Sequence, residues 1–444
     1  MLKTLHKVSS HSSKILARDD GGDVLRYGDL TDHENFWREA IPERSFVILL
    51  CENTVPHLGA YIGLHAAGHA ILLLPAKISN AHLMQMIETY QAQAVVSVQN
   101  GLVRCEQHYV RSEALHPDLS ICLSTSGSTG SPKLVRFNDR QLYANAESIA
   151  EYLDLTEDEI PLAHLPMEYS FGLSVIHSHM LVGATLLLSN ASVMQPQFWE
   201  NFSEATSLAG VPFHYDMLLR IRLEKRDSKN LRTLVQAGGR LPKDKVLTLH
   251  DIASEKGWKF HVMYGQTEAG PRITWLPHSC IPEYPDCIGQ PIPGVEVELV
   301  NEEMVIKSSS VMMGYAETRA DLSEGDVMNG VLYTGDLAEW VDDRFLRIKG
   351  RKSRFIKLQG NRVGLQEIED FFASIDIEVV CKGVDDSLTV FTTSGPKEKI
   401  SETIIENFSF SPRSFNVVLL DEVPRLSNGK IDYKSLNALG DGGV

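Results

Sequence analysis

The sequence lacks the features of a secreted or membrane-spanning protein. Its six cysteines are scattered, without a Cys-x-x-Cys pair or the spacing of a disulfide framework, so we expect free thiols in a reducing cytoplasm. The longest apolar runs, such as residues 70–74 and 184–188, have the length of a strand and fall far short of the roughly 18 residues that cross a bilayer. Basic residues lie near the N-terminus, but no apolar segment typical of a secretory signal follows them. These absences predict a cytoplasmic protein without membrane insertion.

Positive charge and clustered metal ligands are also scarce. The 58 acidic residues outnumber the 42 basic ones, which gives a net charge of −16 and disfavours a nucleic-acid partner. The 16 histidines are dispersed, and only His177 and His179 lie close together. Residues two positions apart on a helix face different sides, so ordinary packing explains this pair better than a zinc site does. An anionic ligand would therefore need a local cationic site.

The order of apolar and amphipathic segments predicts an α/β fold. A chain of 444 residues is too long for a single core. Short apolar runs alternate with helix-length segments over residues 46–98 and again over 161–263, which indicates two doubly wound subdomains with parallel sheets. After Pro271, prolines and glycines accumulate between short alternating segments, which favours a small antiparallel or barrel-like piece. Beyond the basic run at 349–354, we expect a small α+β domain joined at a hinge.

A hydroxyl- and glycine-rich segment closed by a lysine follows the apolar run at residues 119–123. It reads Ser124-Thr125-Ser126-Gly127-Ser128-Thr129-Gly130-Ser131-Pro132-Lys133. Glycines let backbone N–H groups approach an anion, hydroxyls add donors and the lysine adds a full positive charge, so the composition indicates a phosphate site. The lysine does not directly follow a glycine as in a Walker loop, which argues against ordinary NTPase chemistry. Taken alone, the segment is equally compatible with a flexible surface connector.

Further motifs later in the chain add complementary chemistry. Tyr264-Gly265-Gln266-Thr267-Glu268 combines an aromatic face, a hydroxyl and a carboxylate, which suit a nucleobase, a phosphate and Mg²⁺. Tyr333-Thr334-Gly335-Asp336 places a carboxylate on a tight turn, where it can accept hydrogen bonds from ribose hydroxyls. Gly350-Arg351 supplies a guanidinium for phosphate. An Asn-Gly turn within residues 424–430 presents Lys430.

In this order, the motifs resemble those of the adenylate-forming superfamily, which comprises acyl- and aryl-CoA synthetases, peptide-synthetase adenylation domains and firefly-type luciferases. The resemblance runs from about residue 46 to 436. It implies a large N-terminal domain, residues 1–350 with an abbreviated first subdomain, and a small mobile C-terminal domain, residues 351–444. It also implies that ATP and Mg²⁺ activate a carboxylic acid as an acyl-adenylate, and that a thiol then takes the acyl group.

The resemblance assigns a role to each motif. Thr267 would contact the α-phosphate, Glu268 would hold Mg²⁺, and Asp336 would bind the ribose hydroxyls with Arg351 nearby. Lys430 would bridge the substrate carboxylate and the α-phosphate, where cations offset the repulsion between two anions. The remaining ATP and AMP contacts would come from Ser124, Thr125, Ser126, Gly127, Ser128, Thr129, Gly130, Lys133, Gly238, Gly239, Arg240, Tyr264, Gly265 and Gln266.

The second half-reaction in this family follows a rotation of the C-terminal domain. The resemblance places the hinge of this rotation at Ser353, where the family usually has Asp or Lys. This residue departs from the family pattern, so the way in which the domain rotates can differ in detail. A small residue can still absorb a backbone change. Rotation would bring in the loop at 357–360, whose Gly360 leaves room for a pantetheine arm.

The stretch at residues 166–173 resembles the family segment that lines the acid pocket. Tyr169 would be its gate, next to Phe171 and Gly172. Amino-acid-activating members carry an Asp where this chain has Gly172; without that carboxylate a buried ammonium group would be uncompensated, so we expect a fatty or aryl acid. Further pocket candidates, for each of which core packing is about as good an explanation, are Val211, Phe213, His214 and Met263.

The sequence leaves the acceptor thiol open. No carrier domain follows Lys430, so we expect a free-standing enzyme that uses CoA or the phosphopantetheine of a separate acyl-carrier protein. A rival of another class is a non-catalytic acyl- or nucleotide-binding module that has kept the fold. Such a module should have lost chemistry-bearing residues, whereas Lys430, Glu268 and Asp336 are all present.

Overall fold

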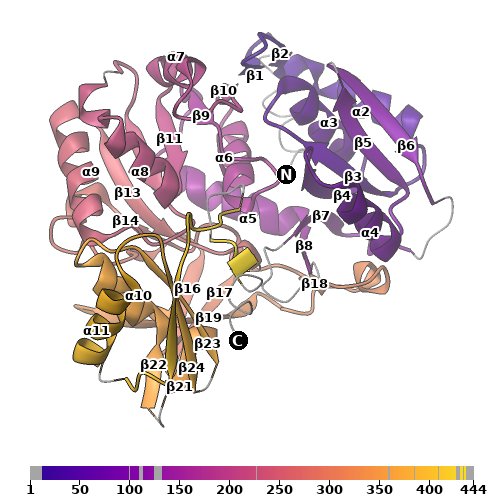
Figure 1. Ribbon diagram of the computed structural model, residues 1–444. Helices are drawn as coiled ribbons and strands as arrows, with labels where there is room; N and C mark the ends of the chain where they lie inside the picture. The colour runs from indigo at the N-terminus through magenta and orange to yellow at the C-terminus, as the bar shows by residue number, and fades with distance from the viewer. Residues whose placement is uncertain are drawn as a thin grey trace. The chain divides into compact units, whose positions relative to one another are not determined.

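The strongest apolar runs of the sequence form the centre of a seven-stranded sheet (Figure 1). The computed structural model describes residues 13–99, 101–109, 114–124, 133–226, 228–358, 361–384, 386–408, 410–426, 431–433, 435 and 436. Four strands of this sheet, from β7 to β5 in the order below, are parallel, and they are nearly continuous in apolar residues because both faces are buried. The strand order is β18 (Gly314–Ala316), β8 (Leu134–Asn138), β7 (Leu119–Ser124), β4 (Ala70–Pro75), β3 (Phe46–Cys51), β5 (Ala94–Gln99) and β6 (Leu102–Gln107).

A second sheet of nine strands is built from the middle of the chain and from its first hairpin. Its six inner strands, from β13 to β1 in the order below, are parallel, and antiparallel pairs close both ends. The order is β15 (Gln290–Pro291), β14 (Thr274–Leu276), β13 (Lys259–Tyr264), β12 (Thr233–Gln236), β11 (Ser207–Gly210), β9 (Pro161–Ala163), β10 (Leu186–Leu188), β1 (Ile15–Asp19) and β2 (Val24–Arg26).

Helices connect the parallel strands and bury their apolar faces. Helices α3 and α6 meet through Tyr61, whose hydroxyl lies 2.7 Å from Nε2 of His177. His177 therefore has a packing partner of its own. The helices of this part are α2 (Leu30–Ala40), α3 (Val55–Ala66), α4 (Asn80–Tyr90), α5 (Asp139–Tyr152), α6 (Ser170–Leu181), α7 (Pro196–Glu204), α8 (Pro212–Arg220) and α9 (Lys243–Lys256). None of the helices in the described ranges is long and apolar enough to cross a bilayer.

The rest of the chain forms smaller sheets. A four-stranded sheet has the order β16 (Val295–Val300), β17 (Glu303–Ser308), β19 (Val331–Val341) and β20 (Phe345–Arg351). It is followed by the hairpin of β21 (Phe355–Leu358) and β22 (Asn361–Gly364), and by the sheet of β23 (Val379–Val384), β24 (Ser387–Thr392) and β25 (Phe415–Leu419). Helices α10 (Leu365–Ala373) and α11 (Lys397–Phe408) contribute Ile368 and Ile404 to a separate apolar core.

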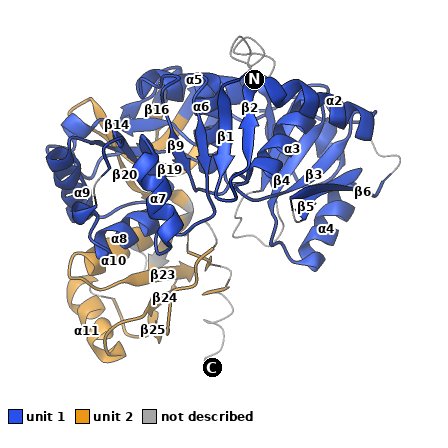
Figure 2. Cartoon of the chain, turned by 90° about the horizontal axis from the view of Figure 1, so that it is seen from above, with its two compact units in different colours: residues 1–297, 306–332 blue, residues 298–305, 333–444 orange. Residues whose placement is uncertain are grey.

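The chain divides into two compact units, which Figure 2 shows in different colours. The first unit comprises residues 1–297 and 306–332, and the second comprises 298–305 and 333–444. The predicted α/β fold, with two doubly wound subdomains, a small antiparallel piece and a smaller C-terminal part, is confirmed. Several strands were not predicted, among them β11, and β8, which lies between the predicted phosphate segment and helix α5. The phosphate segment therefore joins two antiparallel strands and does not lead directly into a helix.

Candidate functional site

The predicted phosphate segment is anchored by strands at both ends. Ser124 is the last residue of β7, and Lys133 directly precedes β8. Nζ of Lys133 lies 2.6 Å from Oε1 of Glu317 and 5.8 Å from the centroid of the Tyr315 ring. Residues Thr125, Ser126, Gly127, Ser128, Thr129 and Gly130 lie outside the described residues, so their phosphate role stays a prediction.

The motif at 264–268 turns sharply as it leaves β13. A Cβ atom on Gly265 would lie 2.0 Å from the carbonyl oxygen of Pro271, so only glycine fits there. The side-chain nitrogen of Gln266 lies 3.4 Å from the Tyr264 hydroxyl. The next residues form a short 3-10 helix (Thr267–Ala269), in which Oγ1 of Thr267 lies 2.9 Å from Oγ of Ser170. This turn therefore gathers an aromatic ring, hydroxyls and the carboxylate of Glu268 in one place.

Two residues that the sequence did not single out connect these motifs. The hydroxyl of Tyr315 donates to Oε1 of Glu268 at 3.0 Å, while Glu317, two positions later, pairs with Lys133. Tyr315 lies in β18, and Glu317 follows this strand directly. A strand of three residues is too short to show an alternation of apolar and polar residues, and its contacts come from distant parts of the chain, so no sequence pattern indicated either residue. The result is one cluster that contains a cation, two carboxylates and a phenol.

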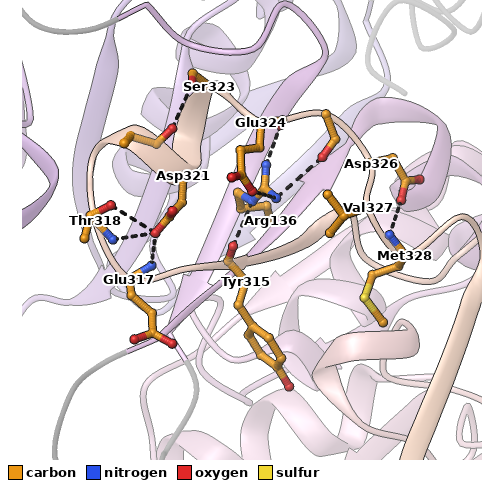
Figure 3. A network of polar contacts seen from close by, with 12 residues as sticks. Arg136, Tyr315, Glu317, Thr318, Asp321, Ser323, Glu324, Asp326, Val327 and Met328 are labelled. Atoms are coloured by element: carbon orange, nitrogen blue, oxygen red, sulfur yellow. Dashed lines mark hydrogen bonds and ion pairs between the residues drawn. The ribbon is translucent and has the colours of Figure 1, made fainter.

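A buried arginine holds the segment that carries Tyr315 and Glu317 (Figure 3). Arg136 in β8 is fully buried. Its guanidinium donates to three main-chain carbonyls: Nε to Tyr315 at 3.2 Å, Nη1 to Glu324 at 2.5 Å and Nη2 to Gly325 at 3.5 Å. Oδ2 of Asp321 accepts from the amides of Glu317 and Thr318, both at 2.8 Å. The segment is thus fixed through its backbone at both ends.

The turn after β12 contains the predicted adenine contacts Gly238, Gly239 and Arg240. Gly238 has a φ of +80°, which favours glycine, and a Cβ there would lie 3.0 Å from the Tyr169 hydroxyl and 3.0 Å from Cγ1 of Val211. The carbonyl of Gly239 accepts a hydrogen bond of 2.8 Å from the Gln236 side chain. The predicted gate Tyr169 and the predicted adenine turn are therefore neighbours.

The predicted acid-pocket residues lie in or beside one apolar cluster. Phe171, Val211 and Met263 are buried members of it. Gly172 is packed so tightly that a Cβ would lie 2.2 Å from the carbonyl oxygen of Pro166. An aspartate at this position would need the backbone to move, so the glycine has a packing reason of its own.

His214 and Phe213 differ from these core residues. Nδ1 of His214 accepts from the Val211 amide at 3.3 Å at the start of α8, and burial, followed by the nearby His164, lowers the pKa of His214 to about 3. His214 is therefore neutral. Phe213 is 43% exposed. The pocket roles of these residues stay predictions.

The second unit brings together the predicted ribose carboxylate and its arginine. Asp336 and Arg351 face each other across β19 and β20, and Nε of Arg351 donates to Oδ1 of Asp336 at 2.9 Å. Asp336 is buried. The predicted hinge Ser353 lies in a 3-10 helix (Lys352–Arg354) of this unit, and its hinge role stays a prediction.

The two remaining predicted residues, Lys430 and Gly360, fall outside the described residues. Arg425 and Ile431, which precede and follow Lys430 in the sequence, form an antiparallel bridge. Across the part of the chain that the structure describes, no group of three or more His, Cys, Asp and Glu side chains is arranged to hold a metal ion. Mg²⁺, however, is commonly held by one or two carboxylates together with substrate phosphates, so Glu268 alone remains a suitable donor.

Comparison with known proteins points in the same direction. The family model for AMP-binding enzymes matches residues 105–316. A long-chain-fatty-acid–CoA ligase of Salmonella typhimurium is 28% identical over 309 residues, which cover 65% of this chain and 54% of the ligase. A 2-succinylbenzoate–CoA ligase of Bacillus cereus is 27% identical over 355 residues, covering 72% of this chain and 70% of that one. The chain thus spans about half the length of the first relative.

Solved structures share the fold over nearly the whole chain. The o-succinylbenzoate CoA synthetase of Bacillus subtilis, in complex with its acyl-adenylate intermediate, aligns with a TM-score of 0.79 at 20% identity and covers 98% of this chain and 97% of its own. The same synthetase in complex with ATP and magnesium aligns with a TM-score of 0.78 at 21% identity, covering 98% of this chain and 99% of its own. The family-model match over residues 105–316, the CoA-ligase relatives and the shared fold agree with the resemblance of the motifs to the adenylate-forming superfamily.

Proposed function

We propose that this chain is an ATP-dependent, AMP-forming acid:thiol ligase that uses CoA. A substrate carboxylate attacks the α-phosphorus of ATP, pyrophosphate leaves, and the CoA thiol then displaces AMP from the acyl-adenylate. The observation that carries the proposal is the pair of contacts made by the segment 315–317, because it joins Glu268 of one motif to Lys133 of another. According to the family resemblance, Glu268 would hold Mg²⁺ and Lys133 would bind phosphate.

The residues of the first unit fit adenylation. The ion pair of Lys133 with Glu317 is partly exposed and therefore weak, so a phosphate can replace the glutamate. Thr267 and Ser170 offer two hydroxyl donors that lie 2.9 Å from each other. A carboxylate is already a nucleophile at neutral pH, so the protein contributes positioning and charge stabilisation and needs no general base.

Glu268 fits the magnesium role. Its Oε1 is oriented by Tyr315, and no other hydrogen bond to its carboxylate is present among the described residues. Bound Mg²⁺ would neutralise phosphate charge. Tyr315 would keep the carboxylate in place while the metal and nucleotide exchange.

The second unit supplies the remaining roles in this proposal. Asp336, held by Arg351, would accept from the ribose hydroxyls, and Lys430 would bridge the two reacting anions. Residues 351–444 would then rotate about Ser353 for thioester formation. The proposal of CoA as acceptor rests on the relatives that are CoA ligases.

Acid-dependent exchange between ATP and pyrophosphate, with Mg²⁺ present, tests this function. We expect exchange with at least one acid in a panel of short, long, aryl and amino acids, and AMP together with acyl-CoA once CoA is added. Exchange without thioester formation unless a carrier protein is supplied would replace CoA by phosphopantetheine. Absence of exchange across the whole panel would favour a non-catalytic binding module.

A further inference from the structure

Arg272 is a buried arginine at the predicted acid pocket. Its side chain is only 2% exposed, and its guanidinium carbon lies 4.2 Å from the centroid of the Phe171 ring. Its Nη1 lies 2.7 Å from Sδ of Met263. Phe171 and Met263 are two of the residues assigned to the acid pocket from the sequence, and a Cβ on Gly238 would meet Phe171 from the adenine turn at 3.7 Å. Arg272 therefore lies next to the place where the acid would bind.

No carboxylate compensates this charge among the described residues. Nε of Arg272 is buried without a hydrogen-bond partner. The groups in contact with the guanidinium are the Met263 thioether, which is only a weak acceptor, and the Tyr152 hydroxyl. The hydroxyls of Tyr169 and Tyr215 lie near enough to act on the guanidinium electrostatically. Burial raises the pKa of Tyr152, so this hydroxyl is neutral. Burial also lowers the pKa of Arg272, but a guanidinium stays protonated in proteins. A buried cation in such surroundings is strongly unfavourable until an anion joins it.

His179 has a buried ring nitrogen without a hydrogen-bond partner, and this residue lines a small cavity together with Arg272. Nδ1 of His179 donates to the carbonyl of Val175 at 2.8 Å, and Nε2 of this histidine is buried without a partner. His179 and Arg272 both line a cavity of about 30 Å³, roughly the volume of one water. Glu159 lines it as well, but its carboxylate already accepts from Thr206 and Arg232. The cavity thus has room for one water, which can satisfy these polar atoms.

We propose that Arg272 binds a second carboxylate of the acid substrate, so that the ligase proposed above acts on a dicarboxylic acid. The planar fork of donors on a guanidinium matches a carboxylate in a bidentate manner. The Met263 sulfur stands where one ligand oxygen would lie, and this flexible side chain can move aside. A water in the cavity can donate both to Nε2 of His179 and to the ligand.

This inference narrows the substrate expected from the sequence. A plain fatty chain or an unsubstituted aryl ring beside Arg272 would leave the guanidinium without a counter-charge. A second anionic group on the same acid supplies that counter-charge and fixes the orientation of the substrate. The inference rests on the proposed adenylation, but it can fail while adenylation stands.

Pairs of acids matched in carbon skeleton test the inference in the exchange assay: hexanoate against adipate, and benzoate against isophthalate. We expect kcat/KM to favour the dicarboxylate by about 10- to 100-fold in each pair, as befits charge-assisted hydrogen bonds. Arg272→Met should lower kcat/KM for the dicarboxylate by at least about 10-fold and abolish the preference, and Arg272→Lys should retain part of it. Arg232→Met is the matched control, since Arg232 is 53% exposed in its side chain and pairs with Glu159.

Two outcomes would overturn the inference. One is a parent enzyme that exchanges hexanoate or benzoate at least as well as the matched dicarboxylate, which leaves adenylation intact. The other is a folded Arg272→Met variant that keeps the preference. If the Arg272→Met variant does not fold, two measurements on the parent enzyme still decide. The parent should prefer the dicarboxylate in exchange, and isophthalate should raise its melting temperature more than benzoate does. Absence of exchange with every acid would remove the proposed function itself.

Discussion

Replacing Gly265 by alanine should damage both the stability of the first unit and adenylation. The added Cβ would lie 2.0 Å from the carbonyl oxygen of Pro271, 2.3 Å from its carbonyl carbon and 2.7 Å from the amide nitrogen of Arg272. All three are backbone atoms, so no side chain can rotate to relieve the contact. Gly265 is not among the glycines with a positive φ, and the cost is therefore steric and not conformational.

The size of the effect follows from the required movement. The Pro271 carbonyl would have to retreat by roughly 1.4 Å to reach ordinary van der Waals contact at 3.4 Å. Overpacking of this kind costs about 1–3 kcal/mol, and we expect the upper half of that range because the adjoining Arg272 is fully buried. The displaced segment also carries Thr267 and Glu268. Misplacement of catalytic groups by about 1 Å can lower a rate by about 100-fold.

Calorimetry and the ATP–pyrophosphate exchange assay check this prediction. Gly325→Ala is the matched control, because its Cβ would meet nothing closer than 3.5 Å, and its free energy of unfolding should change by less than about 0.5 kcal/mol. A Gly265→Ala protein that is as stable as the control and exchanges at the parent rate would refute the argument that this close approach positions the site.

Three further predictions concern single side chains. Tyr315→Phe removes the hydroxyl that donates to Glu268, worth about 1 kcal/mol, and should raise the Mg²⁺ concentration for half-maximal exchange about 5-fold; Tyr143→Phe, which removes a tyrosine bond to a glutamate on α5, should not. Burial, more than nearby Glu52, raises the pKa of Glu168 from 4.5 to about 7. The protonated carboxyl group contributes its full stability below pH 4.5, and this contribution is lost as the pH rises through 7. Glutamine stays neutral at every pH. Relative to the parent, Glu168→Gln should therefore raise the free energy of unfolding by up to about 3 kcal/mol at pH 8 and leave it unchanged near pH 4. Lys430→Ala should abolish adenylate formation but keep thioester formation from a supplied acyl-adenylate, whereas Lys397→Ala should affect neither.

Each of these predictions has a contrary result. A lower Mg²⁺ requirement in Tyr315→Phe would mean that the phenol competes with the metal. A constant stability difference between Glu168→Gln and the parent from pH 4 to 8 would show that the carboxyl group does not titrate in that range. Equal loss of both half-reactions in Lys430→Ala would contradict a lysine that serves adenylation alone.

The sequence predicted best what depends on local pattern. The apolar runs at 46–50, 70–74 and 119–123 became strands β3, β4 and β7, because buried parallel strands are continuously apolar. Helix α5 begins at Asp139, directly after Asn138, a residue type that favours helix N-caps and whose side chain accepts from the amide of Gln141 at 2.9 Å. That Arg351 lies near Asp336 was implied by the family resemblance, and β19 and β20 place the two residues opposite each other.

What the sequence could not show depends on distant contacts. Strand β8 carries Arg136 at its centre, and a charged residue in a five-residue segment argues against a buried strand. Its carbonyl partners lie 179 or more positions away. In the sequence, Gly172 served only as evidence that the pocket has no aspartate at this position. The close approach of Gly172 to Pro166 depends on tertiary packing and could not be seen in the sequence. Arg272 gave no signal at all, because an arginine in a loop is usually at the surface.

The way in which Arg136 holds its loop has a consequence for how the chain tolerates mutation. Its hydrogen bonds go to the carbonyls of residues 315, 324 and 325, and a carbonyl is present whichever side chain occupies the position. Most substitutions at 324, and many of those nearby, should therefore leave the loop where it is. Lysine at 136 offers one point charge in place of a planar fork and cannot reach several carbonyls at once. In a saturation-mutagenesis library selected for activity, position 136 should be nearly invariant while position 324 varies freely.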